Sequence, residues 1–466
     1  MRATSAGSEA ELMIGTLNLQ AIAAATGGVL KGTDISVDRV CTDSRKIQAG
    51  DLFVALSGDN FDGNQFVDVA KDAGAVASVV SDATDLLPNI RVSDTRRALG
   101  LIARENRRRF TGPLVAITGS SGKTSTKGML AAIFAQCGEV YATVGNLNNE
   151  IGVPHSLLAI SAQHQFAVIE MGAAKQGDIH YLCEFAEPTI AVLTNAQHAH
   201  LEGFGSLAAV AETKGEIFRG LAKGGLAIIN ADDAHCSLWQ SYASHVQQRL
   251  FSLVREDVDV FARDIDLSEP GKVRFELVSF AGSAKVCMPL SGRHMVANAL
   301  AAAAAALSAG ASLGEVVSGL ESVRGVSGRL LRRNVAGIEL IDDSYNANPG
   351  SVRAAIEVLA SSLGRNVLVL GHMAELGAEA AQQHREIAAY ARENRLDAVF
   401  FTGEYASIMA TEFGCNAYAF DNKPDLIAAL KNYLEAGDTV LVKGSRSAEM
   451  DVVVDVLTTD LVQRGN

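Results

Sequence analysis

The chain has 466 residues, of which 48% are hydrophobic and 20% are charged, a composition typical of globular proteins with large cores. Its formal net charge of −13 disfavours long-range attraction to nucleic acid or to an anionic membrane surface. Six scattered cysteines without a Cys-x-x-Cys pair argue against a disulfide framework or a zinc site.

The amino-terminal stretch Met1 to Ala10 is small and polar and lacks the apolar segment of a secretory signal. We expect roughly the first 15 residues to be poorly ordered. The most apolar run, Ala297 to Leu307, is mostly alanine and too short to cross a bilayer, so it predicts a tightly packed helix. We therefore expect a cytoplasmic protein that neither inserts into membranes nor binds nucleic acid.

The expected first domain covers residues 1–112 and consists of short mixed elements. A helix is predicted over Leu19–Thr26, because two glycines follow it. Ser44 and Arg45 belong to a polar segment that, by chemistry alone, is typical of a solvated turn. The basic run Arg107–Arg109 ends a predicted helix, where positive charge favours the helix dipole and does not by itself indicate a ligand.

The central domain, residues 113–326, begins with a predicted phosphate-binding loop. Leu114–Ile117 is apolar and partly β-branched, as in a buried strand, and Thr118–Gly122 supplies the small residues of a tight loop. Lys123 and Thr124 then open a helix, so that loop N–H groups and the positive helix end can face one anion. Lys123 would reach the β- and γ-phosphates of a nucleotide, and the Thr124 hydroxyl would hold Mg²⁺.

This loop departs from the usual P-loop, because Ile117 stands where the pattern Gly-x-x-x-x-Gly-Lys-[Ser/Thr] has its first glycine. The glycines that the loop does carry are Gly119 and Gly122. An ordinary strand–turn–helix with a chance Gly-Lys-Thr is the alternative interpretation.

Later strands of this domain alternate with helices, which predicts a parallel sheet covered on both faces. The strand Phe166–Glu170 ends in a carboxylate that we expect beside the Mg²⁺, because ligands bind at such strand ends; a plain surface carboxylate is the alternative. The next strand leads to His198 and His200, which suit either metal binding or the capping of a loop. Lys214 follows on a helix and by chemistry alone is an ordinary solvated lysine.

Short alternating strands within residues 252–289 predict an antiparallel appendage. Asn298, near the start of the alanine-rich helix, would either cap that helix or present its amide to a base. The third domain, residues 327–466, again alternates strands and helices, but its first strand is not followed by Gly-x-Gly-x-x-Gly. That strand ends in the polar segment Asp342–Pro349, and the last strand ends in Lys443–Arg446, a second candidate anion site.

Together these motifs occur in the order found in Mur ligases, and the chain resembles that family from about Leu17 to its end. The residues that carry the resemblance are Thr118–Thr124, Glu170, Asn195 with His200, Lys214, His294 with Asn298, Arg329 and Asp343. The segments that resemble the dipeptide-adding member of the family are Gly145–Pro154, Ala199–Ser206, Lys214–Phe218, Asp343–Pro349 and Gly371–Gly377.

The resemblance implies an α/β fold with a small mixed first domain, a central ATPase-type parallel sheet and a Rossmann-like third domain. It also implies an ATP-dependent amide ligase of peptidoglycan precursor synthesis. The terminal carboxylate of a UDP-N-acetylmuramoyl-tripeptide would receive the γ-phosphoryl group of ATP. The amine of D-alanyl-D-alanine would then displace phosphate from this acyl phosphate.

The same resemblance implies a role for each of several residues. Lys123, His200 and Lys214 would be catalytic. Two Mg²⁺ ions are expected, one on Thr124 and Glu170, the other on His200 and a carbamylated Lys214, because a free ammonium has no lone pair for a metal. The residues expected to bind ATP are Gly119, Ser120, Ser121, Gly122, Lys123, Thr124, Ser125, Asn298, Arg329, Asp343, Tyr345 and Asn346. The residues expected to bind the UDP-substrate are Ser44 and Arg45 for the diphosphate and Asn146, Asn148 and Asn149 for the peptide.

Two other interpretations stay open. Another Mur ligase or a folylpolyglutamate synthetase would share the ATP site, although the first domain and the asparagine-rich segment argue against the latter. A nucleotide-dependent binding or regulatory module would leave the combination of Glu170, His200 and Lys214 unexplained. The expected partners are small-molecule substrates, the expected state is a monomer, and His198 receives no role.

Overall fold

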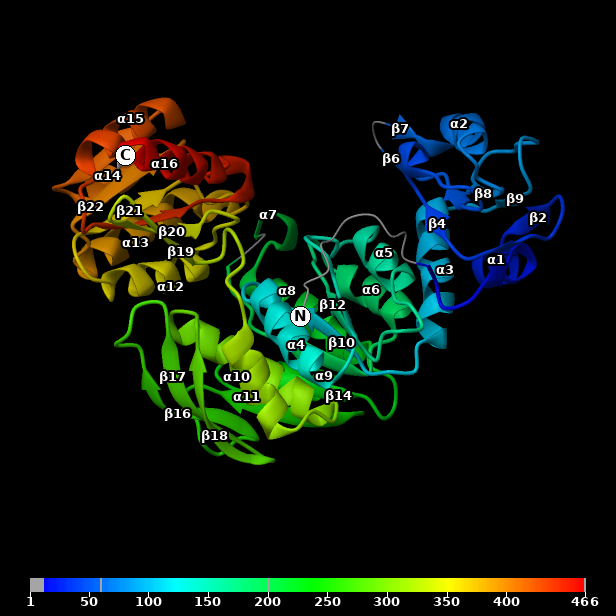
Figure 1. Ribbon diagram of the computed structural model, residues 1–466, viewed down its shortest axis with the longest axis horizontal. Helices are drawn as coiled ribbons and strands as arrows, with labels where there is room; N and C mark the ends of the chain where they lie inside the picture. Colours follow the sequence, from blue (N-terminus) through cyan, green and yellow to red (C-terminus); the bar gives the residue numbers. More distant parts are fainter. Residues whose placement is uncertain (1–11, 59–60, 199–200, 465–466) are drawn as a thin grey trace.

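The computed structural model describes residues 12–58, 61–198 and 201–464, which form three sheet-centred parts in chain order (Figure 1). The amino-terminal and carboxyl-terminal parts lie at opposite ends of the molecule, on either side of the central part. The α/β fold class predicted from the sequence is confirmed. We propose domain boundaries near residues 112 and 326, which leave each large sheet within one segment.

The amino-terminal part is built on a five-stranded sheet in which β2 pairs antiparallel with β9 and the other neighbours pair in parallel. The strand order is β2 (Val29–Lys31), β9 (Asn89–Arg91), β8 (Ala77–Val80), β5 (Leu52–Val54) and β4 (Val40–Cys41). Two short antiparallel pairs are β1 (Leu17–Asn18) with β3 (Ser36–Val37) and β6 (Ser57–Gly58) with β7 (Phe61–Asp62). Its helices are α1 (Leu19–Thr26), α2 (Val67–Asp72) and α3 (Thr95–Arg109), with single 3₁₀ turns η1 (Ser44–Lys46) and η2 (Gly63–Phe66).

The central part is built on a nine-stranded sheet in which β10, the strand before the phosphate loop, is third from one edge. The strand order is β11 (Val140–Ala142), β12 (Phe166–Glu170), β10 (Leu114–Thr118), β13 (Ile190–Leu193), β14 (Leu226–Asn230), β15 (Gln247–Ser252), β16 (Val260–Asp266), β17 (Val273–Ser279) and β18 (Gly282–Met288). Its helices are α4 (Lys123–Cys137), α5 (Gly152–Leu158), α6 (Asp178–Ala186), α7 (Leu201–Phe204), α8 (Leu207–Arg219), α9 (Cys236–Tyr242), α10 (Arg293–Ser308) and α11 (Leu313–Ser322).

Helices cover both faces of this sheet, as the apolar strands predict. Val115 and Ile117 of β10 pack with side chains of α4, α10 and α11. Leu114 and Ala116 point the other way and pack with side chains of α3, α5, α6 and α8. The alanines of α10 other than Ala297 are buried, which confirms the predicted tightly packed helix.

The strands expected to form an antiparallel appendage extend the main sheet instead. β16 is hydrogen-bonded in parallel to β15, with Phe251 opposite Val260 and Ser252 opposite Phe261. Only then does the direction change, because β17 pairs antiparallel with β16 and with β18. The alternation of short strands was visible in the sequence, but the pairing partner of the first strand was not.

The carboxyl-terminal part is built on a six-stranded sheet with helices on both faces. The strand order is β19 (Leu331–Val335), β20 (Ile338–Asp343), β24 (Thr439–Lys443), β21 (Asn366–Leu370), β22 (Ala398–Thr402) and β23 (Ala417–Phe420), with β19 antiparallel. Its helices are α12 (Pro349–Ala360), α13 (Ala380–Glu393), α14 (Ala406–Phe413), α15 (Lys423–Tyr433) and α16 (Asp451–Arg464), with 3₁₀ turns η3 (Gly377–Glu379) and η4 (Arg446–Ala448).

Of the segment expected to be poorly ordered, residues 1–11 lie outside the described structure, and the residues that follow differ from the expectation. Met13 is buried, and the Ile14 amide donates to the side-chain oxygen of Asn106 at 2.7 Å. Residues 13 and 14 therefore belong to the packed structure.

No helix among the residues that the structure describes is both long enough and apolar enough to cross a membrane.

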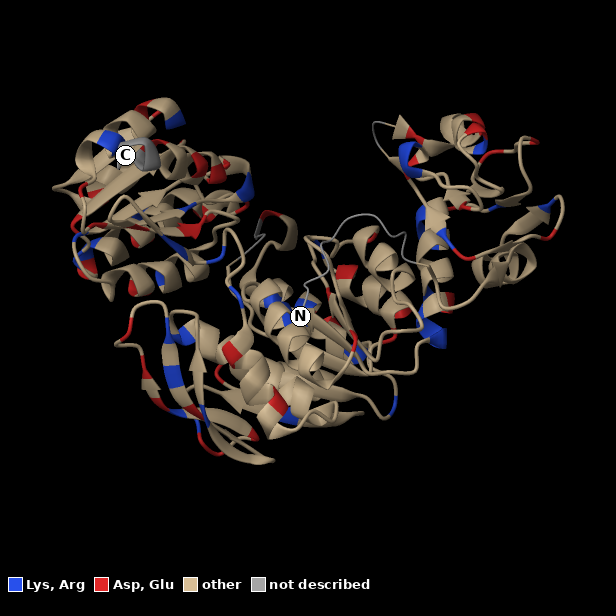
Figure 2. Ribbon diagram, viewed as in Figure 1, with Lys and Arg blue, Asp and Glu red and all other residues tan. Residues whose placement is uncertain are grey.

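The basic run at the end of α3 does more than favour that helix's dipole, so the sequence interpretation was incomplete (Figure 2). Arg107 is buried and donates to the carbonyl of Phe110 at 2.9 Å. It also donates to the carbonyls of Ala186 and Glu187, at 2.8 and 3.0 Å, at the end of α6. Arg108 pairs with the exposed carboxylate of Glu187 at 2.7 Å. The run therefore fastens α3 to the end of α6.

We expect Arg107→Met to lower the free energy of unfolding of the central part by about 3 kcal/mol, because three buried carbonyls would lose a charged donor. Arg108→Met is the matched control, with an expected loss below about 1 kcal/mol, because it breaks an exposed ion pair. The measurement is urea denaturation followed by the fluorescence of Trp239, the chain's single tryptophan, which is buried in the central part. Equal losses for the two variants would contradict this account.

Candidate active site

A cavity of about 1410 Å³ lies where the carboxyl ends of the central strands face the carboxyl-terminal part. Ligands of parallel α/β sheets bind at such strand ends. Its lining combines the phosphate loop, the asparagine-rich segment after β11, the ends of β12, β13 and β14, and residues of the third sheet. Of the residues expected at the site, those in the lining are Ser120, Ser121, Gly122, Lys123, Thr124, Ser125, Asn146, Asn148, Asn149, Glu170, Asn298, Arg329, Asp343, Tyr345 and Asn346.

The phosphate loop is shaped by two positions at which no side chain fits. A Cβ at Gly119 would lie 1.8 Å from the Thr194 hydroxyl, and one at Gly122 would lie 2.3 Å from the Asn298 side-chain oxygen. Gly122 also has a φ of +83°, in the left-handed region that favours glycine, and it caps α4. Lys123 begins the helix, and its ammonium donates to the Gly119 carbonyl at 2.6 Å. The lysine therefore lies over the loop, at the helix N-terminus where backbone N–H groups favour an anion.

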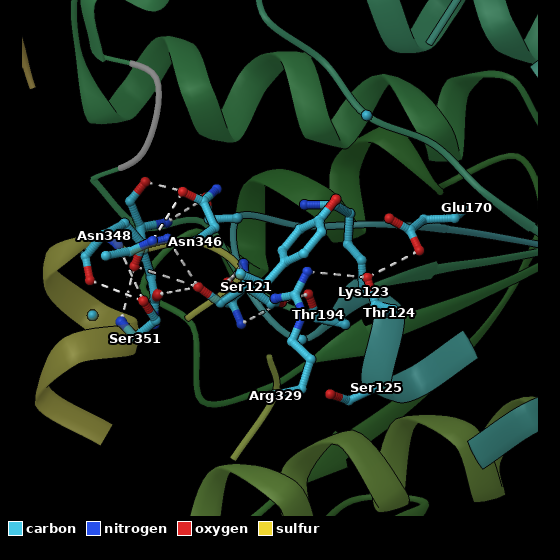
Figure 3. A pocket seen from close by; sticks show the side chains of 18 of the residues that line it. Ser121, Lys123, Thr124, Ser125, Glu170, Thr194, Arg329, Asn346, Asn348 and Ser351 are labelled. Atoms are coloured by element: carbon cyan, nitrogen blue, oxygen red, sulfur yellow. Dashed lines mark hydrogen bonds between the residues drawn. The ribbon is translucent and has the colours of Figure 1, made fainter. Parts of the chain in front are cut away.

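Glu170 ends β12 beside this loop, as predicted (Figure 3). The Thr124 hydroxyl donates to Glu170 Oε2 at 3.1 Å, Lys127 Nζ lies 3.0 Å from the same oxygen, and Asn148 donates to Oε1 at 2.9 Å. Burial alone would raise the pKa of Glu170, but the charges of Lys127 and Lys123 outweigh it and hold that pKa below its usual value. The carboxylate is therefore ionised at neutral pH.

These groups fit a magnesium ion bound together with a nucleotide. The hydroxyl of Thr124 and the carboxylate of Glu170 are hard oxygen donors, and Mg²⁺ is commonly held by one or two such groups plus phosphate oxygens. Within the described ranges, no group of three or more His, Cys, Asp or Glu side chains could hold a metal without such a ligand. The site thus suits a cation that arrives with its phosphates.

Lys214 lies on α8 and, contrary to the solvated lysine that its chemistry alone suggested, is 1% exposed. Burial, and next the charge of Lys123, lower the pKa of Lys214 well below its usual value. Its Nζ lies 5.9 Å from the centre of the Phe204 ring. His200, expected to share a metal with Lys214, lies outside the described residues.

Arg329 brings the carboxyl-terminal part to the phosphate loop (Figure 3), and Tyr345 lines the same cavity. The Arg329 guanidinium lies 4.2 Å from the centre of the Tyr345 ring and donates to the Thr124 hydroxyl at 3.4 Å. Ser121 connects the two parts again, since it accepts a hydrogen bond from the Asn348 amide at 3.1 Å and donates to the Gln197 side chain at 3.0 Å. The cavity is therefore assembled from both parts.

Two expectations in this region need correction. Asn298 does not cap α10, because Gly292 is the N-cap and Asn298 lies inside the helix against Gly122. In the second candidate anion site, Lys443–Arg446, the correction concerns Lys443, which is not free: it is buried, pairs with Asp343 at 2.5 Å and donates to the Asn346 carbonyl at 2.9 Å. Ser445 and Arg446 of the same segment line the cavity, so an anion site there stays a prediction. Burial raises the pKa of Asp343, and the charge of Lys443 opposes that rise.

Ser44 and Arg45 are the expected substrate residues that the structure does not bring to the cavity. They lie in η1 of the amino-terminal part, where the exposed Arg45 pairs with Asp43 at 2.8 Å. The hydrogen bond from Arg45 lowers the pKa of Asp43 to about 2. The nearby Thr42 hydroxyl lies 3.0 Å from His155 Nε2 on α5, whose first residues follow the asparagine-rich segment.

Sequence reasoning missed several polar residues of the site, among them Lys127, Gln197 and Asn348. Lys127 carried a signal, because it follows Lys123 by four residues and so lies on the same face of α4. Asn348 lay within the polar segment after β20, where its position as the N-cap of α12 could have been predicted from the following proline. For Gln197, neither the spacing nor the neighbouring residues predicted a place in the site.

Comparison with known proteins identifies relatives over most of the chain. The Mur ligase middle domain matches residues 117–306, the Mur ligase glutamate ligase domain matches residues 328–446, and the Mur ligase family catalytic domain matches residues 36–107. The UDP-N-acetylmuramoyl-tripeptide--D-alanyl-D-alanine ligase of Escherichia coli (strain K12) is 46% identical over 434 residues, which cover 92% of this chain and 96% of that protein.

Solved structures agree with this comparison. The crystal structure of MurF from Acinetobacter baumannii matches with a TM-score of 0.90 and 36% identity, covering 96% of this chain and 99% of that one. The MurF ligase of Thermotoga maritima, solved in complex with ADP, matches with a TM-score of 0.82 and 29% identity, covering 91% and 98%.

We expect Gly122→Ala to weaken the binding of ADP by at least about tenfold, because a left-handed φ costs a residue with a Cβ about 1–2 kcal/mol and the new methyl would displace Asn298. Gly128→Ala is the control on the same helix, where an added Cβ meets nothing within 4 Å. It should leave binding unchanged and favour the helix slightly. Isothermal titration calorimetry measures both, and normal ADP affinity in Gly122→Ala would contradict the loop geometry.

Proposed function

The chain belongs to the Mur ligase family, and we propose that it is an ATP-dependent ligase that joins D-alanyl-D-alanine to a UDP-N-acetylmuramoyl-tripeptide in peptidoglycan precursor synthesis. The observation that carries this proposal is a single cavity that holds a phosphate loop, the buried carboxylate Glu170 and an asparagine-rich segment suited to a peptide. Relatives that share this architecture are named for the same reaction.

The reaction needs two transfers at one place. A carboxylate oxygen of the tripeptide attacks the γ-phosphorus of ATP, the bond to the bridging oxygen breaks, and ADP leaves. The amine of D-alanyl-D-alanine then attacks the acyl carbon, the tetrahedral intermediate expels phosphate, and the nitrogen loses its proton. Both steps depend on positioning and on neutralising phosphate charge.

The chain supplies that neutralisation with cations at the mouth of the loop. Lys123 lies against the Gly119 carbonyl, from which its ammonium can turn to the β- and γ-phosphates. Arg329 reaches Thr124 from the other side and comes from the carboxyl-terminal part. A nucleotide bound between them would draw the two parts together. Tyr345, Asn346, Asp343 and Asn298 line the same cavity and are proposed to contact the nucleoside.

Magnesium, when bound, would neutralise the phosphate oxygens and orient the γ-phosphoryl group. We propose that Thr124 and Glu170 hold one ion, because their oxygens already lie 3.1 Å apart. Lys214 and His200 are proposed to hold a second. For Lys214 this requires conversion to a carbamate, which carries oxygens and a negative charge in place of an ammonium.

Burial favours that conversion of Lys214. An amine must be unprotonated to attack carbon dioxide, and the lowered pKa of Lys214 raises its unprotonated fraction at neutral pH. The nitrogen releases a proton as the bond to carbon dioxide forms, so the carbamate carries a new negative charge in a buried place and needs a cation partner. A metal ion shared with His200 would provide one.

Further proposals concern the substrate and the setting. Ser44 and Arg45 would hold the uridine diphosphate, and Asn146, Asn148 and Asn149 would lie along the peptide. We propose a monomer that acts in the cytoplasm on small-molecule substrates.

The first test is phosphate release by the purified protein with ATP and Mg²⁺, with UDP-N-acetylmuramoyl-tripeptide and D-alanyl-D-alanine added separately and together. Release is expected only with both, together with a product heavier by the dipeptide minus water. Phosphate release with a different acid or amine would assign the chain the substrates of another member of the same family. Release that depends on neither would favour a nucleotide-driven binding module.

The second test addresses the carbamate. Lys214→Ala should lose ligation by at least about a hundredfold and recover partly with added acetate, whose carboxylate can take the place of the carbamate. Acetamide, which has the same size and no charge, is the control and should not restore activity. Equal effects of acetate and acetamide would argue against a carbamate.

A further inference from the structure

Lys127 is a buried cation whose contacts link the carboxylate of the active site to the asparagine-rich segment. It follows Thr124 by three residues and Lys123 by four, so α4 presents all three on one face. Its side chain is 9% exposed. Nζ lies 3.0 Å from Glu170 Oε2 and donates to the Gly145 carbonyl at 3.1 Å.

The same segment is fastened to β12 at a second point. Asn148 donates to Glu170 Oε1 at 2.9 Å, and the Asn148 carbonyl accepts from the Gly172 amide at 2.7 Å. A Cβ at Gly172 would lie 3.0 Å from the Asn148 side-chain oxygen, so this contact is close. Glu170 is thus held by Lys127 on one oxygen and by Asn148 on the other.

Apolar packing alone does not fix residues 144–147, which are exposed. Val144 and Leu147 are 55% and 40% exposed, and Gly145 has a φ of +55° with nothing within 4 Å of a Cβ built on it. Segments with so few packing contacts depend on polar ties for their order. The hydrogen bond from Lys127 supplies such a tie from the rigid start of α4.

We propose that Lys127 is a positioning residue that holds the segment Gly145–Asn149 in register with Glu170, so that a peptide carboxylate bound along the segment meets the phosphate loop. The inference rests on the proposed function, because it assigns the segment to the acyl substrate. One ammonium thereby serves two needs: a donor for the Gly145 carbonyl and a counter-charge for the buried Glu170. Lys127 lies outside the lining of the cavity, so it acts through these neighbours.

A purely structural or charge-balancing role predicts a different pattern of defects. If Lys127 only neutralised Glu170, replacing it would weaken the binding of nucleotide and metal at least as much as the binding of the UDP-tripeptide. If Lys127 positions the segment, its replacement lowers mainly the affinity for the UDP-tripeptide, and it does so even when ATP and Mg²⁺ are absent. The two roles are therefore separated by which ligand loses affinity.

The test compares Lys127→Met with the wild type and with Lys223→Met, which removes an equal charge from an exposed position. Titration calorimetry with UDP-N-acetylmuramoyl-tripeptide alone, without ATP or Mg²⁺, should show a Kd raised at least about tenfold in Lys127→Met only. The KM for that substrate should rise similarly, while the KM for ATP changes less than about threefold. Lys127→Arg, which keeps charge and donors, should recover part of the affinity.

Unchanged tripeptide affinity in folded Lys127→Met, or equal losses for tripeptide and ATP, would overturn the inference. If Lys127→Met does not fold, Lys127→Gln tests the inference instead: it lacks the charge and keeps only a shorter donor, so its Kd for the tripeptide substrate should still rise more than its Kd for ATP. Measurements on the wild type distinguish a failure of the proposed function from a failure of the role proposed for Lys127. If the wild type itself fails to bind the tripeptide substrate, the proposed function fails; if it binds and the variants bind equally well, only the role of Lys127 fails.

Discussion

The close approach of the phosphate loop to its neighbours is the constraint on which the site depends. Gly119 lies against Thr194 at the end of β13, and Gly122 lies against Asn298 of α10, in both cases with no space for a Cβ. The loop is therefore held between a strand end and a helix before any ligand binds. The shape of the loop fixes where α4 begins. Helix α4 then places Lys123, Thr124 and Lys127 beside Glu170 at the carboxyl end of β12.

This placement explains how an acidic protein can bind a polyanion. The net charge of −13 is spread over the whole chain, whereas Lys123 and Lys127 act on the buried carboxylate of Glu170 and Arg329 donates to the neighbouring Thr124 hydroxyl, so three cations lie at the phosphate loop. Within a partly desolvated cavity such local charges outweigh the distant ones, which salt screens. Lys214 differs from Lys123 in its surroundings, because it lies away from the cavity lining. Burial lowers the pKa of both amines, but the charge of Glu170 opposes this for Lys123, whereas the pKa of Lys214 falls well below its usual value.

Local patterns predicted the elements that carry the site, and long-range pairings escaped prediction. The strands predicted over Leu114–Ile117 and Phe166–Glu170 and the helix start predicted at Lys123 agree with the structure to within a residue, because each depends on its own sequence. The pairing of Asp343 with Lys443 joins residues 100 positions apart on neighbouring strands, and only the sheet order reveals it. The binding roles of the ATP and substrate residues remain predictions.

The proposed substrate requires that Arg45 and the cavity lie apart. A UDP-linked peptide carries its diphosphate at one end and its reacting carboxylate at the other, so the two binding regions must lie apart. Helix α5 connects them: it starts after Asn149, whose side chain accepts from the Gly152 amide at 2.8 Å, and its His155 contacts Thr42 beside the η1 turn. Seven helical residues span about 10 Å. An extended substrate held at both places would therefore run alongside α5, and the contact between Thr42 and His155 would set the separation of its two ends.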